Sequence, residues 1–110
     1  MQKQYEQCME ECLECLQVCN YCFDACLKED NVSMMADCIR LTRECADICS
    51  YAASFMSRKS QFSQRMCQLC ADICDACAAE CEKHSSHHDH CRNCAETCKK
   101  CADTCRAMAA

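Results

Sequence analysis

Cysteine recurs every three or four residues along most of this chain, and that spacing limits the possible folds more than any other feature. Residues three and four apart lie on the same face of an α-helix, so each run of cysteines predicts a helix with a stripe of thiols along one side. The first run holds six cysteines, the second three, and the third and fourth five each. In order, these nineteen residues are Cys8, Cys12, Cys15, Cys19, Cys22, Cys26, Cys38, Cys45, Cys49, Cys67, Cys70, Cys74, Cys77, Cys81, Cys91, Cys94, Cys98, Cys101 and Cys105.

The composition favours an entirely helical protein. The chain of 110 residues contains no glycine and no proline, the residues that build tight hairpins and left-handed helix ends. Aliphatic side chains are few, so the cysteines have to supply much of the interior. They can do so as free thiols, because reduced cysteine packs as a small hydrophobic side chain.

We predict an all-α protein with a single domain over residues 1–110, an antiparallel up-down-up-down four-helix bundle whose cysteines face the core. The expected helices cover residues 2–28, 34–57, 61–83 and 87–107. The connections between them are short, which places successive helices side by side and antiparallel. Ser33, Ser60 and Ser86 are the expected capping residues before the last three helices.

A high cysteine content is typical of secreted proteins with disulfide bonds, but three features argue against that class. The first residues lack the basic start and apolar run of an export signal, so we expect a cytoplasmic protein with reduced thiols. Nineteen is an odd number, which leaves at least one thiol unpaired. Disulfides within one stripe would also be strained. Neighbouring Cβ atoms on a helix are about 5 to 6 Å apart, whereas a disulfide joins Cβ atoms roughly 3.5 to 4.5 Å apart.

Charge and hydropathy exclude two further classes of partner. The net charge is −5 and no basic patch is present, so nucleic acid is not an expected partner. No apolar run reaches the length of about eighteen residues that a membrane span needs, so no membrane insertion is expected.

Stripes of thiols indicate a site for soft metal ions, which means Cu(I), Zn(II) or iron–sulfur clusters. Zn(II) requires four ligands in a closed tetrahedron, and iron–sulfur proteins use a few isolated cysteines, often followed by proline. Cu(I) is satisfied by two or three thiolates, which neighbouring cysteines on one helix and its partner can supply. We therefore predict that all nineteen cysteines bind multiple Cu(I) ions.

Charge balance also favours Cu(I). Burial should keep the thiols of the empty protein protonated and neutral. Each Cu⁺ that binds displaces one proton, so at one ion per cysteine the core stays neutral, whereas Zn(II) with four thiolates leaves two negative charges per site. The expected capacity therefore approaches about one Cu(I) per cysteine, with protons released on loading.

One end of the predicted bundle gathers imidazoles and thioethers. The residues are His84, His87, His88, His90, Met34 and Met35. We expect them to be weak, transient ligands at a mouth through which copper enters and leaves. The alternative is a solvated histidine-rich loop with two methionines filling the end of the bundle, and the sequence favours neither interpretation.

The sequence resembles the cytosolic members of the bacterial copper storage protein family, which are four-helix bundles with inward cysteines that hold many Cu(I) ions. The similarity covers the six-cysteine first stripe and the segments CIRLTRECADIC, CQLCADICDACAAEC and HCRNCAETCKKCADTC. The resemblance implies a homotetramer and a cytosolic role in copper storage or detoxification, with no catalytic step. It also favours the histidine end as the entry point. A copper chaperone that delivers or collects the ions would be a further partner.

Two other functions stay open at the level of sequence. One is a general soft-metal buffer that binds zinc or cadmium through the same thiolates. The other is redox chemistry, in which CxxC pairs cycle between dithiol and disulfide. Redox chemistry is the less favoured, because no alternation of strand and helix surrounds any CxxC pair.

Overall fold

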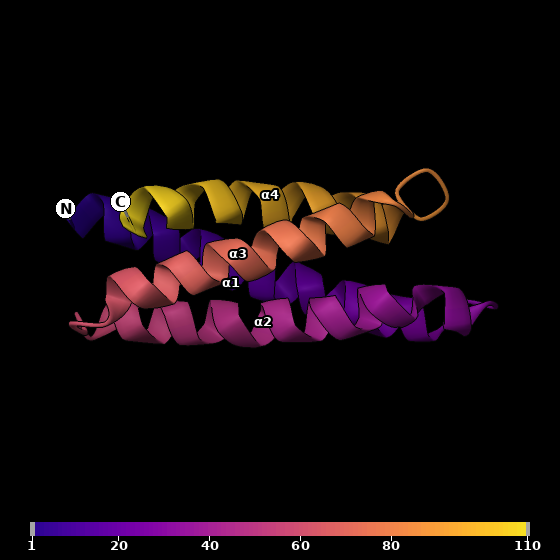
Figure 1. Cartoon of the computed structure of the whole chain (residues 1–110), viewed down its shortest axis with the longest axis horizontal. Coiled ribbons are helices and arrows are strands. Elements are labelled where there is room, and N and C mark those ends of the chain that lie inside the picture. The colour runs from indigo at the N-terminus through magenta and orange to yellow at the C-terminus, as the bar shows by residue number, and fades with distance from the viewer. Residues whose placement is uncertain (1, 110) are drawn as a thin grey trace.

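Four long helices make up the computed structural model, which describes residues 2–109 (Figure 1). They are α1 (Gln2–Leu27), α2 (Ala36–Ser57), α3 (Ser63–Glu82) and α4 (Asp89–Ala109). A short 3-10 helix, η1 (Val32–Met35), precedes α2. The described residues contain no β-strand, and the prediction of an all-α protein is confirmed.

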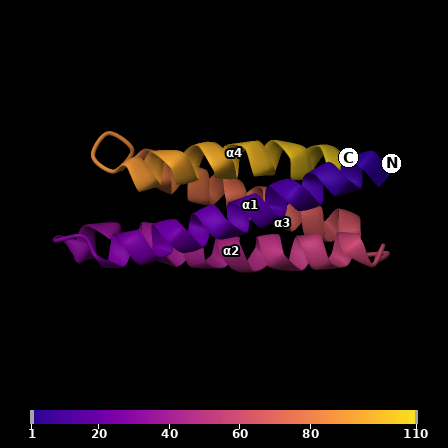
Figure 2. The ribbon, with the colours of Figure 1, turned by 180° about the vertical axis from the view of Figure 1, so that it is seen from behind.

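The helices form a square bundle in which each one packs along two neighbours. The backbones of α1 and α3 both lie against α2 and α4, while the diagonal pairs stay farther apart throughout the described chain. The bundle is 44 Å long and 18 × 17 Å across. Figures 1 and 2 show successive helices running in opposite directions. The predicted up-down-up-down topology is confirmed.

This topology gives the bundle two chemically different ends. The α1–α2 and α3–α4 links, residues 28–35 and 83–88, lie at one end, which we call the histidine end together with the helix turns beside them (Figure 1). The α2–α3 link, residues 58–62, lies at the other end beside the start of α1 and the end of α4. We call this second end the terminal end.

The second helix begins later than the sequence predicts. Residues 32–35 form η1, so α2 begins at Ala36 instead of at residue 34. The expected cap at Ser33 is wrong, because its hydroxyl donates a hydrogen bond of 3.0 Å to the Asn31 side chain. No side chain caps the start of α2, whose first turn instead carries the favourable negative charge of Asp37.

The fourth helix begins at Asp89 and not at residue 87. The amides of His87 and His88 both donate to the carbonyl of His84, so the chain completes a separate turn before α4 starts. The first helical hydrogen bonds of α4 then run to the His88 carbonyl. Because Asp89 lies in the first turn, its carboxylate is next to the positive end of the helix dipole.

The α2–α3 link is a tight turn built without glycine. Lys59 has a left-handed backbone conformation, with φ of 55°. The Ser60 amide donates to the Phe55 carbonyl at 3.0 Å, and the Lys59 amide donates to the Met56 carbonyl at 3.1 Å. These two bonds make a Schellman helix end, in which glycine usually takes the left-handed position. Lysine costs about 1 kcal/mol relative to glycine there. The Ser60 hydroxyl accepts a bond from the Phe62 amide just before α3 begins.

The outer faces of the helices are polar. They carry exposed ion pairs between successive turns, such as Lys28 with Asp24 at 2.8 Å and Arg43 with Asp47 at 3.1 Å. Exposed pairs of this kind contribute little to stability, so the fold depends on its interior. Within residues 2–109, no helix combines the length and the apolar character needed to cross a membrane.

The interior of the bundle consists mainly of thiols. Every cysteine side chain is 0 or 1% exposed, which confirms that the cysteines face the core. Alanines fill most of the remaining core positions, and the larger buried apolar residues are Met35, Ile48 and Met56. Thr42 occupies a position of the α2 stripe and donates a hydrogen bond of 2.8 Å to the Cys38 carbonyl, so its hydroxyl is satisfied.

Candidate metal centre

The nineteen cysteines form a continuous array along the bundle axis, which we call the thiol core. All of them are free thiols. The spacing of three and four residues keeps each stripe on the inner face of its helix, so sulfur atoms from different helices meet at the axis. Contacts between helices range from 3.3 Å, between Cys38 and Cys81, to 3.9 Å, between Cys49 and Cys74.

All four helices meet around Cys45 in the middle of the bundle. Its Sγ atom lies 3.5 Å from Cys74 of α3, 3.8 Å from Cys98 of α4 and 3.9 Å from Cys15 of α1. The sparse stripe of α2 therefore provides a central sulfur that reaches the other three stripes. A metal ion at this level can draw ligands from any of the four helices.

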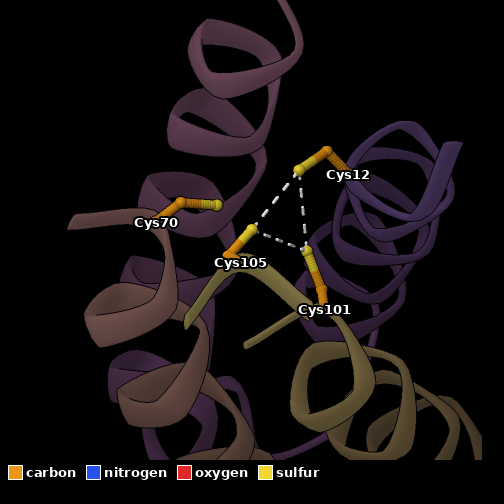
Figure 3. A group of neighbouring side chains, drawn as sticks. All are labelled: Cys12, Cys70, Cys101 and Cys105. Carbon is orange, nitrogen blue, oxygen red and sulfur yellow. Dashed lines mark hydrogen bonds between the residues drawn. The ribbon is translucent and has the colours of Figure 1, made fainter. Parts of the chain in front are cut away.

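A group nearer the terminal end shows how compact these sites are (Figure 3). The Sγ atoms of Cys12, Cys70, Cys101 and Cys105 all lie within 4.8 Å of one another. Cys12 is 3.6 Å from Cys105 and 3.8 Å from Cys101. Figure 3 shows these sulfur atoms converging from α1, α3 and α4. Two or three of them can reach one soft ion with little side-chain movement.

Neighbouring groups share their sulfur atoms. Besides the group in Figure 3, further sets of four thiols lie within 4.8 Å of one another, among them Cys15, Cys45, Cys49 and Cys74; Cys15, Cys19, Cys45 and Cys98; and Cys19, Cys77, Cys94 and Cys98. Cys15, Cys19, Cys45 and Cys98 each belong to two of these sets, so each of these thiols can serve either of two neighbouring groups. Ions bound there would share thiolates with their neighbours.

Burial in the thiol core favours the protonated, neutral form of a thiol. Hydrogen bonds with neighbouring thiols, Cys101 first, together with burial raise the pKa of Cys70 to about 11. The pKa of Cys98 is also raised, by its hydrogen bonds with Cys15, Cys19 and other thiols and by burial. A neutral thiol is compatible with a dry interior, whereas a thiolate needs a bound cation beside it.

His90 extends the thiol core at the histidine end. Its Nδ1 atom lies 3.3 Å from Cys22, 3.5 Å from Cys91 and 4.0 Å from Cys26. These four residues bring their ligand atoms within 4.8 Å of one another. The imidazole is only 12% exposed, so it lies at the boundary between the thiols and the surface.

Glu29 is a residue of this end that the sequence did not lead us to expect. Its carboxylate accepts a hydrogen bond of 2.8 Å from His90 and lies 3.1 Å from Nδ1 of His88. The bond from His90 holds the pKa of Glu29 below its usual range. One signal was present in the sequence, because Glu29 follows Cys26 by three residues and so occupies the next position of the first stripe.

The other residues predicted at the mouth differ from one another in their contacts and in their exposure. His88 and His90 stack with ring centroids 5.3 Å apart, and His84 lies 3.2 Å from Glu80 instead of from a thiol. His87 is exposed and lines a surface pocket with Met34, which is 64% exposed. The remaining predicted residue, Met35, is buried in the core. The structure thus brings all six residues to one end, and within residues 2–109 His90 is the one of the six that forms hydrogen-bond contacts with thiols.

Comparison with known proteins identifies the class of this centre. The family model for copper storage proteins matches residues 1–110, and a search of curated proteins gives no match. A Cu(I)-bound copper storage protein is 50% identical, with a TM-score of 0.92 over 97% of this chain and 99% of that one. The metal-free copper storage protein 3 from Bacillus subtilis is 51% identical, with a TM-score of 0.89 over 96% and 98% of the two chains.

A third structure comes from a more distant relative. A cytosolic copper storage protein from Streptomyces lividans, loaded with five coppers, is 40% identical, with a TM-score of 0.94 over 97% of this chain and 92% of that one. The match of the family model over the whole chain and these identities agree with the geometry of the thiol core. The chain belongs to the copper storage protein family.

Proposed function

We propose that this protein stores Cu(I) in its thiol core, with all nineteen cysteines as ligands and a capacity of up to about one ion per cysteine. The observation that carries the proposal is the continuous array of buried thiols, in which facing helices bring sulfur atoms to within 3.3 to 3.9 Å. The protein is a metal store and not an enzyme, as the function of its family implies.

Cu(I) suits this array better than Zn(II). A Zn(II) ion needs four ligands, and four thiolates around one Zn(II) leave two negative charges in the buried core. Cu(I) tolerates two or three shared thiolates, and each ion replaces one proton, so the dry interior stays neutral as it fills. The charge balance therefore favours a monovalent soft ion.

The histidine end is the proposed mouth. His90 contacts the outermost thiols on one side and Glu29 on the other, so an ion at the surface can reach the core through one imidazole. His88 shares Glu29 with His90, while His84, His87 and Met34 surround this point with further weak ligands. Met35 covers the core from the inner side of the same pocket.

The proposal also includes a cellular location, an oligomeric state and a protein partner. The relative from Streptomyces lividans is described as cytosolic, which supports a cytoplasmic location for this chain. A homotetramer is proposed from the family resemblance, and exposed apolar side chains such as Leu13 and Leu69 are suitable for contacts between copies. A copper chaperone is a proposed partner at the histidine end.

Competition between metals tests the choice of Cu(I). The reduced protein is first filled with Zn(II) and then given Cu(I) from a buffered donor under nitrogen. We expect Cu(I) to displace Zn(II) completely and to release about one proton for each ion that binds to a free thiol. Retention of Zn(II) at a comparable Cu(I) level would instead identify a general soft-metal buffer. Free-thiol counts that change reversibly with mild oxidants, at constant metal content, would point to redox chemistry.

A further inference from the structure

The terminal end of the thiol core holds a buried thioether in the position of a cysteine. Met56 follows Cys49 by seven residues, so it lies on the same face of α2, and its side chain is only 2% exposed. Within the described residues 2–109, all the other large apolar side chains of α2, such as Ile48, are less buried than Met56. The α2 stripe therefore ends at this side on a soft sulfur that is enclosed by the core.

The geometry of Met56 matches that of the thiol pairs. The Sγ–H group of Cys67 donates to the Sδ atom of Met56 at 3.7 Å, so a lone pair of the thioether faces the thiol proton. Metal–sulfur bonds of about 2.3 Å place two sulfur ligands roughly 3.8 to 4.0 Å apart in tetrahedral or trigonal sites, and about 4.6 Å apart in a linear site with two ligands. The distance between Cys67 and Met56 is close to the first value and shorter than the second. Replacing the thiol proton by a metal ion needs little movement of either side chain.

Cys67 directs its thiol proton to this thioether and not to another thiol. The sulfur hydrogen bond of Cys67 in the described part of the chain runs to Met56, whereas Cys105 makes such bonds with Cys8, Cys12 and Cys101. Proximity to Cys105 and Cys8, together with burial, raises the pKa of Cys67 and keeps it a neutral thiol in the empty protein. A Cu(I) ion on Cys67 needs a second ligand, and Met56 is the sulfur already aligned with it.

We propose that Met56 is a Cu(I) ligand, which with Cys67 forms a mixed thiolate–thioether site at the terminal end of the thiol core. This proposal rests on the proposed storage of Cu(I). Methionine sulfur is a soft donor suited to Cu(I), and it carries no charge. One Cu⁺ bound to one thiolate and one thioether is therefore neutral, as in the rest of the core. The ion at this site is farthest from the histidine end and should be the last to leave.

The test is NMR of the protein labelled with carbon-13 at the methionine methyl groups, recorded during anaerobic Cu(I) titration. Cu(I) is diamagnetic, so each methyl signal can be followed to saturation and assigned by single Met→Leu variants. We expect the Met56 methyl signal to shift and to remain shifted at full loading. The signal of Met66, which is partly buried against the core from α3 and has no sulfur hydrogen bond within the described residues, is the matched control and should move little.

A second measurement uses Met56→Leu, with Met66→Leu as its control. Leucine keeps the packing volume and leaves the thiols in place, so both variants should fold and load. We expect a chelator to remove the final equivalent of Cu(I) about tenfold faster from Met56→Leu, with no change for Met66→Leu.

Two results would overturn the proposal: an unshifted Met56 methyl in a protein filled with many Cu(I) ions, or equal release rates for the two variants. Failure of the protein to take up Cu(I) at all would instead overturn the storage function. The two failures are therefore distinguishable in the same titration.

Discussion

The Nδ1 atom of His90 lies 3.3 Å from the Sγ atom of Cys22, while Nε2 of the same ring donates to Glu29 at 2.8 Å. One imidazole thus joins the thiol core to the surface. We expect His90→Ala to slow Cu(I) loading about tenfold, the size of effect typical of removing a partner of a metal ligand. The capacity should fall by no more than about one ion, because the nineteen thiols are unchanged.

Stopped-flow loading from a buffered Cu(I) donor measures this effect. Gln68→Ala is a suitable control, because Gln68 lies on the exposed face of α3 and its side chain donates to Asp72 on the same face. Equal loading rates for His90→Ala and Gln68→Ala would place the mouth elsewhere. A large loss of capacity in His90→Ala would show that the imidazole has a structural role in the core.

The metal-free protein should lose stability at alkaline pH. The pKa of Cys70 is about 11 in the fold and 9.0 for an ordinary thiol, so between these values the folded state binds more protons than the unfolded state. The free energy of unfolding therefore decreases as pH rises through this window, by about 1 kcal/mol per pH unit for such a thiol.

Chemical denaturation of the reduced protein at pH 8, 9 and 10 checks this dependence. Cys70→Ala should show a smaller decrease with pH than the parent protein. A free energy of unfolding that is constant or rises over this range would contradict a core of neutral thiols.

The reduced, metal-free protein should already be helical. Its thiols pack as neutral small side chains, and no buried side-chain nitrogen or oxygen in the described residues lacks a hydrogen-bond partner. Circular dichroism of the protein in a chelator and a reductant should show the full helical spectrum, with little change on adding Cu(I). A disordered spectrum that becomes helical only with metal would mean that copper drives folding, as zinc does in zinc fingers.

The left-handed backbone of Lys59 leads to a prediction about the stability of the fold and not about metal binding. Because it has φ of 55°, Lys59→Gly should remove the cost of a left-handed lysine and raise the free energy of unfolding by about 1 kcal/mol. Lys83, at the end of α3, has φ of −61°, so Lys83→Gly should give no such gain. The denaturation midpoints of Lys59→Gly and Lys83→Gly, each compared with that of the parent protein, measure this difference. A loss of stability in Lys59→Gly would show that its side chain contributes more than its backbone costs.

The regular part of this molecule follows directly from the spacing of its cysteines. Steps of three and four residues fix which face of each helix is buried, and short links then allow only antiparallel neighbours. Helix ends were less predictable, since they depend on backbone hydrogen bonds such as those from His87 and His88 to the His84 carbonyl. No pattern of residue types in the sequence predicts that turn.

The contacts at the two ends of the thiol core were harder to foresee for the same reason. Glu29 and His90 lie 61 positions apart in the chain and meet only because two links come together at the histidine end. At the terminal end, the contact between Met56 and Cys67 depends on the tight turn at Lys59. Sequence periodicity describes what happens within a helix, whereas these contacts depend on how links place helix ends.

Native mass spectrometry during anaerobic Cu(I) titration tests the central claim most directly. The continuous thiol core predicts that the chain binds many Cu(I) ions, rising toward about one for each of its nineteen cysteines, while the protein stays folded. Saturation at only a few ions per chain, with most thiols still free, would contradict it.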